Sequence, residues 1–153
     1  MEKENPLVSI ITPCYNGENV MHRLLDSILS QTYSNIEFIL INDGSTDHSE
    51  EIWYQYEKKF NEKGIKTIYI HQRNQGLGAA INAGLKVFTG DYLCWPDIDD
   101  YFEDTSVEKR VNFLETHKEY GSVSSDANQY MEDNLSEPVG TMASWLKHKE
   151  DEW

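Results

Sequence analysis

Basic residues are scarce in this sequence. It has 13 lysines and arginines against 27 aspartates and glutamates, which gives a formal net charge of −14 at pH 7. The excess is concentrated late in the chain, because residues 1–96 carry a net −4 and residues 97–153 a net −10. A surface of this charge repels the phosphates of nucleic acids and of anionic lipids. We therefore expect no nucleic-acid partner.

Long apolar runs and cysteine pairs are also missing. No stretch approaches the ~18–20 apolar residues that span a bilayer, and the opening MEKENP lacks the basic and apolar regions of a signal peptide. The two cysteines, Cys14 and Cys94, are too few for a disulfide framework and form no CxxC pair. These features predict a cytoplasmic protein with free thiols and no transmembrane segment.

Strand-like and helix-like segments alternate along the chain. Apolar, β-branched segments predict strands, and amphipathic or Ala-rich segments predict helices. The expected strands are 7–12, 36–41, 66–71 and 91–95, and the expected helices are 18–31, one from a capping box at Asp47 to Gly64, 77–88, and 105–117. Residues 121–127 are a weaker strand candidate, and 142–149 read as a short terminal helix.

This alternation predicts an α/β fold with a mainly parallel sheet. Such sheets bind ligands at the carboxyl ends of their strands. In this chain those ends carry TPCYN, INDGSTD, HQRNQG and WPDIDD, all of them polar or turn-rich. We therefore expect the functional site at this edge.

Three carboxylates follow the fourth expected strand. Asp97, Asp99 and Asp100 lie within four positions, and like charges so close destabilise one another unless a cation lies among them. On an extended segment, Asp97 and Asp99 would lean toward one point, with Ile98 directed the other way. Their hard oxygen ligands suit Mg²⁺ or Mn²⁺. The alternative is an acidic turn before the next helix.

Side chains at the other strand ends each have two interpretations. Asp43 either accepts a hydrogen bond from a base or only forms a turn, and Tyr15 either stacks on a base or packs. Arg73 either meets a diphosphate or is a solvated surface arginine. Trp95 either lines a sugar pocket or packs in the core, and core packing is the favoured interpretation.

Four stretches taken together resemble the family 2 glycosyltransferases, which have the GT-A fold. They are VSIITPCYNGENV, LLDSILSQTYSNIEFILINDGSTD, NQGLGAAINAGL and GDYLCWPDIDD, within residues 7 to about 120. Jointly these motifs are specific, although each would be weak alone. The resemblance implies a Rossmann-like, three-layer α/β/α sandwich. It also implies binding of a nucleotide-diphosphate sugar, a UDP-sugar first of all, together with Mn²⁺ or Mg²⁺.

The resemblance also implies roles for individual residues. Pro13 and Tyr15 resemble the residues that flank the nucleobase, and Asp43 the one that hydrogen-bonds it. Asp97 resembles the acid that faces the ribose and sugar, and Asp99 the metal ligand of the D-x-D motif, so that both acids form the expected metal site. The implied reaction is an inverting displacement at the anomeric carbon, in which the cation neutralises the departing diphosphate.

The implied setting is the synthesis of a cell-surface polysaccharide or glycolipid, with a saccharide or lipid-linked acceptor. Such an enzyme works on the cytoplasmic face, which would allow peripheral membrane association of the full-length protein. This setting is an analogy with the family and rests on no residue of the chain.

The sequence departs from the family pattern in two ways. Leu77 and Ile81 stand where many relatives have a basic residue, so diphosphate contact would fall to Arg73 or to downstream residues. The family's catalytic base belongs to an acceptor-binding half, and we expect it beyond Trp153.

We therefore expect residues 1–153 to be a single donor-binding domain of a longer enzyme. Its core would span about 7–127, followed by a poorly defined tail over 128–153. We expect it to bind donor and metal but to transfer little or no sugar. The alternatives are a nucleotidyltransferase-like enzyme on a similar sheet and a non-catalytic nucleotide-binding or interaction module.

Overall fold

A computed structural model describes residues 5–131 and 134–141 of the chain. The chain divides into two compact units, Met1–Asn112 and Phe113–Trp153. All of the site residues expected from the sequence belong to the first unit.

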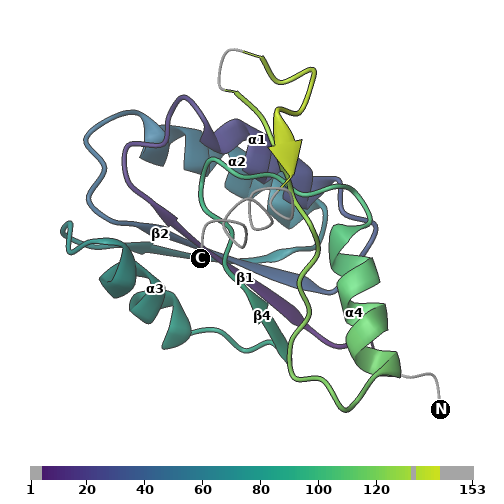
Figure 1. The fold of residues 1–153 in the computed structure, drawn as a ribbon. Helices are drawn as coiled ribbons and strands as arrows, with labels where there is room; N and C mark the ends of the chain where they lie inside the picture. The colour runs from purple at the N-terminus through teal and green to yellow at the C-terminus, as the bar shows by residue number, and fades with distance from the viewer. Residues whose placement is uncertain (1–4, 132–133, 142–153) are drawn as a thin grey trace, which may run out of the picture. The chain divides into compact units, whose positions relative to one another are not determined.

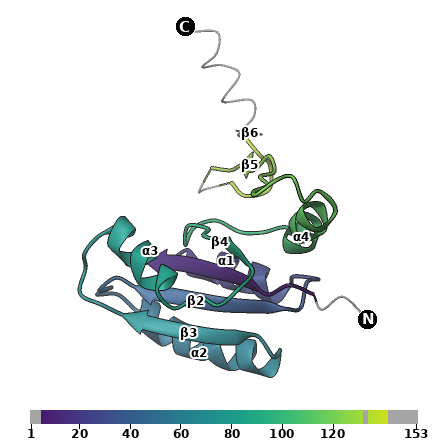
Figure 2. The same ribbon diagram turned by 90° about the horizontal axis from the view of Figure 1, so that it is seen from below.

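The first unit is built on a four-stranded parallel sheet (Figure 1). The strands β1 (Val8–Cys14), β2 (Ile36–Asn42), β3 (Lys66–His71) and β4 (Tyr92–Cys94) pair in the order β3-β2-β1-β4. Figure 2 shows β3, β2 and β1 side by side. The central strands β1 and β2 are buried along almost their whole length. Burial on both faces explains why their sequences are nearly continuous apolar runs.

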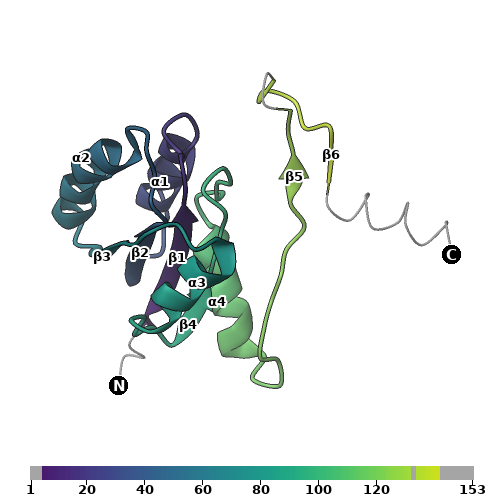
Figure 3. The ribbon, with the colours of Figure 1, turned by 90° about the vertical axis from the view of Figure 1, so that its left-hand side faces the viewer.

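Helices cover both faces of this sheet. On one face lie α1 (Met21–Leu29), α2 (Ser49–Glu62) and the first turns of α4 (Ser106–Thr116), and on the other lies α3 (Leu77–Leu85). Figures 1 and 3 show α1 and α2 next to each other, and the two helices are in contact. The expected α/β/α sandwich with a parallel sheet is confirmed.

The core has one large and one small cluster because the two faces are covered unequally. The large cluster, under α1 and α2, contains the rings of Phe38, Trp53 and Phe60, whose centroids lie 5.2–6.0 Å apart. The small cluster lies under α3, where a Cβ added at Gly84 would lie 2.5 Å from Cγ2 of Ile11. A glycine is therefore required for α3 to approach the sheet this closely.

The end of α2 follows its local signal. Gly64 has φ +77°, and its N–H donates to the carbonyl of Asn61 at 3.0 Å. The N–H of Ile65 donates to the carbonyl of Phe60 at 3.0 Å. These two bonds form a Schellman motif, so the helix-ending role predicted for Gly64 is confirmed.

The start of α2 does not follow the predicted capping box. His48 precedes the helix and makes no side-chain capping bond. Asp47 accepts hydrogen bonds from the N–H of Ser49 at 3.0 Å and from the N–H of Glu18 at 2.9 Å. The carboxylate that was expected to cap α2 therefore ties the helix start to the loop after β1.

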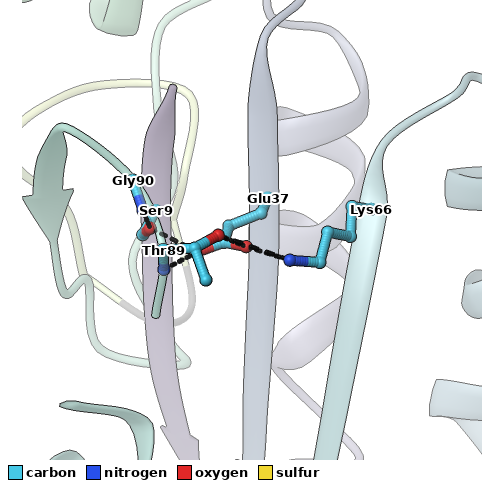
Figure 4. Close-up of polar contacts among 5 residues, drawn as sticks. All are labelled: Ser9, Glu37, Lys66, Thr89 and Gly90. Atoms are coloured by element: carbon cyan, nitrogen blue, oxygen red, sulfur yellow. Dashed lines mark hydrogen bonds and ion pairs between the residues drawn. The ribbon is translucent and has the colours of Figure 1, made fainter. Parts of the chain in front are cut away.

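A buried carboxylate lies at the amino-terminal edge of the sheet (Figure 4). Glu37, the second residue of β2, accepts from the hydroxyl of Ser9 at 2.6 Å and the ammonium of Lys66 at 2.9 Å. The backbone N–H and the hydroxyl of Thr89 donate to it at 2.5 and 2.8 Å. Burial by itself would raise the pKa of Glu37, but these bonds outweigh it and lower the pKa to about 2.

The second unit contains a short antiparallel pair, β5 (Asn128–Gln129) with β6 (Gly140–Thr141). The strand expected at 121–127 is wrong, because these residues form no strand and pairing begins only at Asn128. The terminal helix expected at 142–149 lies outside the described residues. Among the helices that the structure describes, none has the length and apolar character needed to cross a bilayer.

Candidate functional site

The carboxyl ends of the four parallel strands lie at one edge of the sheet. Tyr15 follows β1, Asp43 follows β2, Arg73 follows β3, and Asp97 follows β4. Because the strands are parallel, the topology brings these four loops to the same edge, as the sequence indicated. Pro13 lies inside β1, half-buried and paired in register with Ile41 of β2.

The loops after β1 and β2 are joined by reciprocal hydrogen bonds. The N–H of Asn16 donates to Oγ of Ser45 at 3.0 Å, and the N–H of Thr46 donates to Oδ1 of Asn16 at 2.8 Å. Asn16 has φ +52°, a left-handed conformation that asparagine tolerates better than most residues. These bonds hold the backbone on which Tyr15 stands, and 52% of Tyr15 remains exposed. The packing alternative for Tyr15 is therefore wrong.

Asp43 joins the end of β2 to the loop after β3. Its Oδ1 accepts from the side-chain amide of Gln72 at 2.7 Å and from the N–H of Gln75 at 3.0 Å, and its Oδ2 from the N–H of Gly76 at 2.8 Å. Burial by itself raises the pKa of Asp43, but these bonds to the charged form outweigh it and lower the pKa below its usual value. Asp43 is thus a fixed anion at this edge.

The Asp97–Asp100 segment is a turn. The N–H of Asp100 donates to the carbonyl of Asp97 at 3.1 Å, and the N–H of Asp97 donates to Oδ2 of Asp100 at 3.1 Å. The extended geometry expected for Asp97 and Asp99 is therefore wrong, because Ile98 and Asp99 are the central residues of a turn. Ile98 nevertheless packs on the core, and a Cβ added at Gly17 would lie 3.1 Å from its Cγ1. This contact holds the turn against the loop after β1.

The acidic turn has surplus negative charge at the surface. Asp97, Asp99 and Asp100 are exposed. Partial burial and the neighbouring carboxylates of Asp97 and Asp99 raise the pKa of Asp100, despite its hydrogen bond to Asp97. In the part of the chain that the structure describes, no group of three or more His, Cys, Asp or Glu residues is arranged to hold a metal ion. Carboxylate oxygens are the ligand type that Mg²⁺ and Mn²⁺ prefer, and such cations complete their coordination with water and a ligand.

Exposed apolar side chains accompany the charged ones. Trp95, between β4 and the acidic turn, is 56% exposed, so the expectation that it packs in the core is wrong. Leu77, at the start of α3, is 58% exposed. Arg73 is exposed on the loop after β3. These groups are available to a ligand.

Sequence reasoning did not single out the donors that hold Asp43. The sequence indicates that the polar loop HQRNQG lies at the ligand edge. It does not indicate which of its two glutamines, Gln72 or Gln75, donates to Asp43 through its side chain. One donates through its side chain and the other through its backbone. Only the path of the loop distinguishes them, and no local pattern could have done so.

Proteins of known sequence are similar in sequence to this chain. The Glycosyl transferase family 2 model matches residues 9–150. An uncharacterized glycosyltransferase of Rickettsia prowazekii is 44% identical over 110 residues, which are 72% of this chain and 32% of that protein. One of Haemophilus influenzae is 41% identical over 130 residues, 81% of this chain and 51% of that protein. The chain thus spans about a third of the rickettsial relative and about half of the other.

Solved structures share the fold. Staphylococcus aureus TarS 1-349 in complex with UDP-GlcNAc is 27% identical and aligns with a TM-score of 0.66 over 73% of this chain and 32% of that one. The mannosyltransferase PcManGT of Pyrobaculum calidifontis, in complex with GDP-Man and Mn²⁺, gives a TM-score of 0.67 at 22% identity over 73% of this chain and 33% of that one. At that identity the second likeness concerns the fold alone, which is the expected GT-A fold. With a family model matching residues 9–150, the chain belongs to glycosyltransferase family 2.

Proposed function

We propose that this chain is the donor-binding part of a glycosyltransferase, and that it holds a nucleotide-diphosphate sugar with Mn²⁺ or Mg²⁺. The observation that carries the proposal is the shared edge of the sheet, where a fixed carboxylate, an exposed aromatic ring and an exposed acidic turn meet. Each group matches one part of such a ligand: a base, its flat face, and a diphosphate that needs a cation. The structure of S. aureus TarS with UDP-GlcNAc supports a UDP-sugar as donor.

The nucleoside end of the ligand would lie over the first two strands. Tyr15 presents its ring to the base, with Pro13 beside it, and Asp43 accepts a hydrogen bond from a base N–H. Asp97 faces the ribose and the sugar. The hydrogen bonds between the loops after β1 and β2 fix these groups before the ligand arrives, which reduces the ordering cost of binding.

The diphosphate end would lie over β3 and β4. Asp99, with Asp97, would hold the cation, and Arg73 can supply a second positive charge to the phosphates. A bound cation stabilises the negative charge that develops on the departing diphosphate. The residues of the chain orient the donor so that its anomeric carbon is open to attack and inversion, and they keep the diphosphate in place.

We further propose that the chain alone transfers little or no sugar. Asp126, Glu132 and Asp133 follow the acidic turn, but none matches the family motif that supplies the catalytic base. An acceptor, saccharide or lipid-linked, would be bound by a further part of the enzyme, in the synthesis of a cell-surface polysaccharide or glycolipid at the cytoplasmic face. Incubation with UDP-sugars and Mn²⁺ tests this proposal, because appreciable transfer by the 153-residue chain would contradict it.

Calorimetry tests donor binding directly. We expect the 153-residue chain to bind UDP in the presence of Mn²⁺, and to bind it at least about ten-fold more weakly without the metal or in Asp99→Asn. Glu62→Gln, which removes one exposed charge at the end of α2, is the matched control and should leave the affinity unchanged. If UDP, GDP and dTDP all fail to bind with Mn²⁺, the chain is a non-catalytic module instead.

A further inference from the structure

The carboxylate of Asp43 is almost fully occupied by its own chain. Only 3% of the residue is exposed. Gln72 and Gln75 both donate to Oδ1, at 2.7 and 3.0 Å, and Gly76 donates to Oδ2 at 2.8 Å. A carboxylate offers about four acceptor directions. Among the described residues these three donors fill three of them, which leaves one direction on Oδ2.

The loop that supplies these donors is held in place independently of Asp43. The N–H of Gln72 donates to the carbonyl of Asn42 at 2.9 Å. Gly44 has φ +75°, and a Cβ added there would lie 2.7 Å from the backbone N of Asn74. The loops after β2 and β3 therefore touch through their backbones, and the backbone N–H groups of Gln75 and Gly76 cannot withdraw from Asp43 without moving this contact. Gln72 adds the one side-chain donor, so the count of free acceptor directions depends on that residue.

The number of free directions matters because bases differ in the donors that they offer. Uracil and thymine present one ring N–H between two carbonyls. Guanine presents a ring N–H and an amino group side by side, a fork that pairs best with both oxygens of a carboxylate. A carboxylate whose Oδ1 is already saturated can pair with one member of that fork only. The other donor would then be buried without a partner, which is costly.

We propose that Gln72 is a positioning residue that sets the base specificity of this site, so that it accepts nucleotides of uracil or thymine and disfavours those of guanine. The inference rests on the proposed function, because it assumes that the base of the donor meets Asp43. Gln72 acts through Asp43: its amide occupies Oδ1 and holds the carboxylate plane, and the single direction left on Oδ2 selects a base with a single N–H.

The test compares UDP with GDP by calorimetry on the 153-residue chain with Mn²⁺. We expect UDP to bind at least about ten-fold more tightly than GDP. Gln72→Met keeps the length of the side chain but removes its donor, and should move the UDP-to-GDP affinity ratio toward one by strengthening GDP relative to UDP. Gln55→Met, the same exchange at an exposed position of α2, should leave the ratio unchanged. Thermal unfolding of each variant reports whether it is folded.

Three results would overturn the inference. The first is a wild-type chain that binds GDP as tightly as UDP, a comparison that needs no variant. The second is a folded Gln72→Met variant whose affinity ratio does not change, which would give Gln72 a purely structural role. The third is no binding of either nucleotide. In that case the proposed function fails, and this inference fails with it, whereas the first two results leave the proposed function standing.

Discussion

The two edges of the parallel sheet each hold a buried carboxylate, and the two differ in how they are satisfied. At the amino-terminal edge Glu37 receives four hydrogen bonds, from Ser9, Lys66 and twice from Thr89. At the carboxyl-terminal edge Asp43 receives three. The first group has no acceptor direction left for a ligand, whereas the second has one.

The surroundings of the two carboxylates also differ: the chain encloses Glu37, whereas exposed groups lie on the loops near Asp43. A Cβ added at Gly90 would lie 2.4 Å from Oγ of Ser9, so the chain closes tightly around the Glu37 network. Near Asp43 the neighbouring loops instead expose Tyr15 and the acidic turn. Both edges bury a carboxylate, but only the carboxylate of Asp43 keeps an acceptor direction for a ligand. Under the proposed function, Glu37 serves stability and Asp43 serves recognition.

The largest expected effect is that of Glu37→Gln on stability. An amide at this position turns one acceptor into a donor, which faces donors of Thr89, and leaves the ammonium of Lys66 without its anion. We expect the free energy of unfolding to fall by about 3 kcal/mol in urea titrations. UDP affinity of the folded variant should not change, because the network lies at the opposite edge from the site.

Lys66→Met is the control for that variant. The side chain of Lys66 is 56% exposed, so its ion pair with Glu37 is screened by water. Its loss should cost no more than about 1 kcal/mol. If Lys66→Met is as damaging as Glu37→Gln, the ion pair dominates the network and our account of it is wrong.

The second-largest expected effect is a loss of stability in acid that comes from Glu37. The pKa of Glu37 is lowered from 4.5 to about 2 in the folded chain. A lowered pKa gives stability that is fully present above the unfolded value and is lost as pH falls through the folded value. Between pH 5 and pH 2 we expect Glu37 to account for a loss of about 2–3 kcal/mol. The free energy of unfolding, measured by denaturant titrations at several pH values in this range, should depend less steeply on pH in Glu37→Gln than in the wild type. An equal pH dependence in the two proteins would contradict the assignment.

A smaller effect on stability than that of Glu37→Gln is expected for Asp43→Asn. The amide keeps the shape but loses the charge, and its NH₂ group cannot accept a hydrogen bond, so at best it keeps the bonds from Gln72 and Gln75 and loses the one from Gly76. We expect a loss of about 1–2 kcal/mol in the free energy of unfolding. Unlike Glu37→Gln, this variant should also lose at least about ten-fold in UDP affinity, measured by calorimetry with Mn²⁺. Unchanged affinity in a folded Asp43→Asn would mean that both carboxylates are structural.

The sequence predicted the strands and their shared edge well because burial imposes a simple pattern. β1 and β2 are apolar almost throughout since both of their faces are covered, and Gly64 ends α2 since its conformation suits glycine. The predictions failed where side-chain surroundings decide. Trp95 is large and apolar, yet its strand has already ended, so it is exposed. Asp97 and Asp99 follow a strand, but a hydrogen bond between Asp97 and Asp100 closes a turn.

By itself the sequence determined the class of fold and the edge at which the carboxyl ends of the strands meet, because the alternation of strands and helices along the chain and their hydrophobic periodicity are local properties. Only the tertiary structure decided how each residue at that edge is engaged. The glutamine that reaches Asp43 comes from a loop about thirty residues later in the chain, brought there by the pairing of β3 with β2. Hydrogen bonds between distant segments depend on the path of the backbone in space, and no local pattern of residues encodes that path.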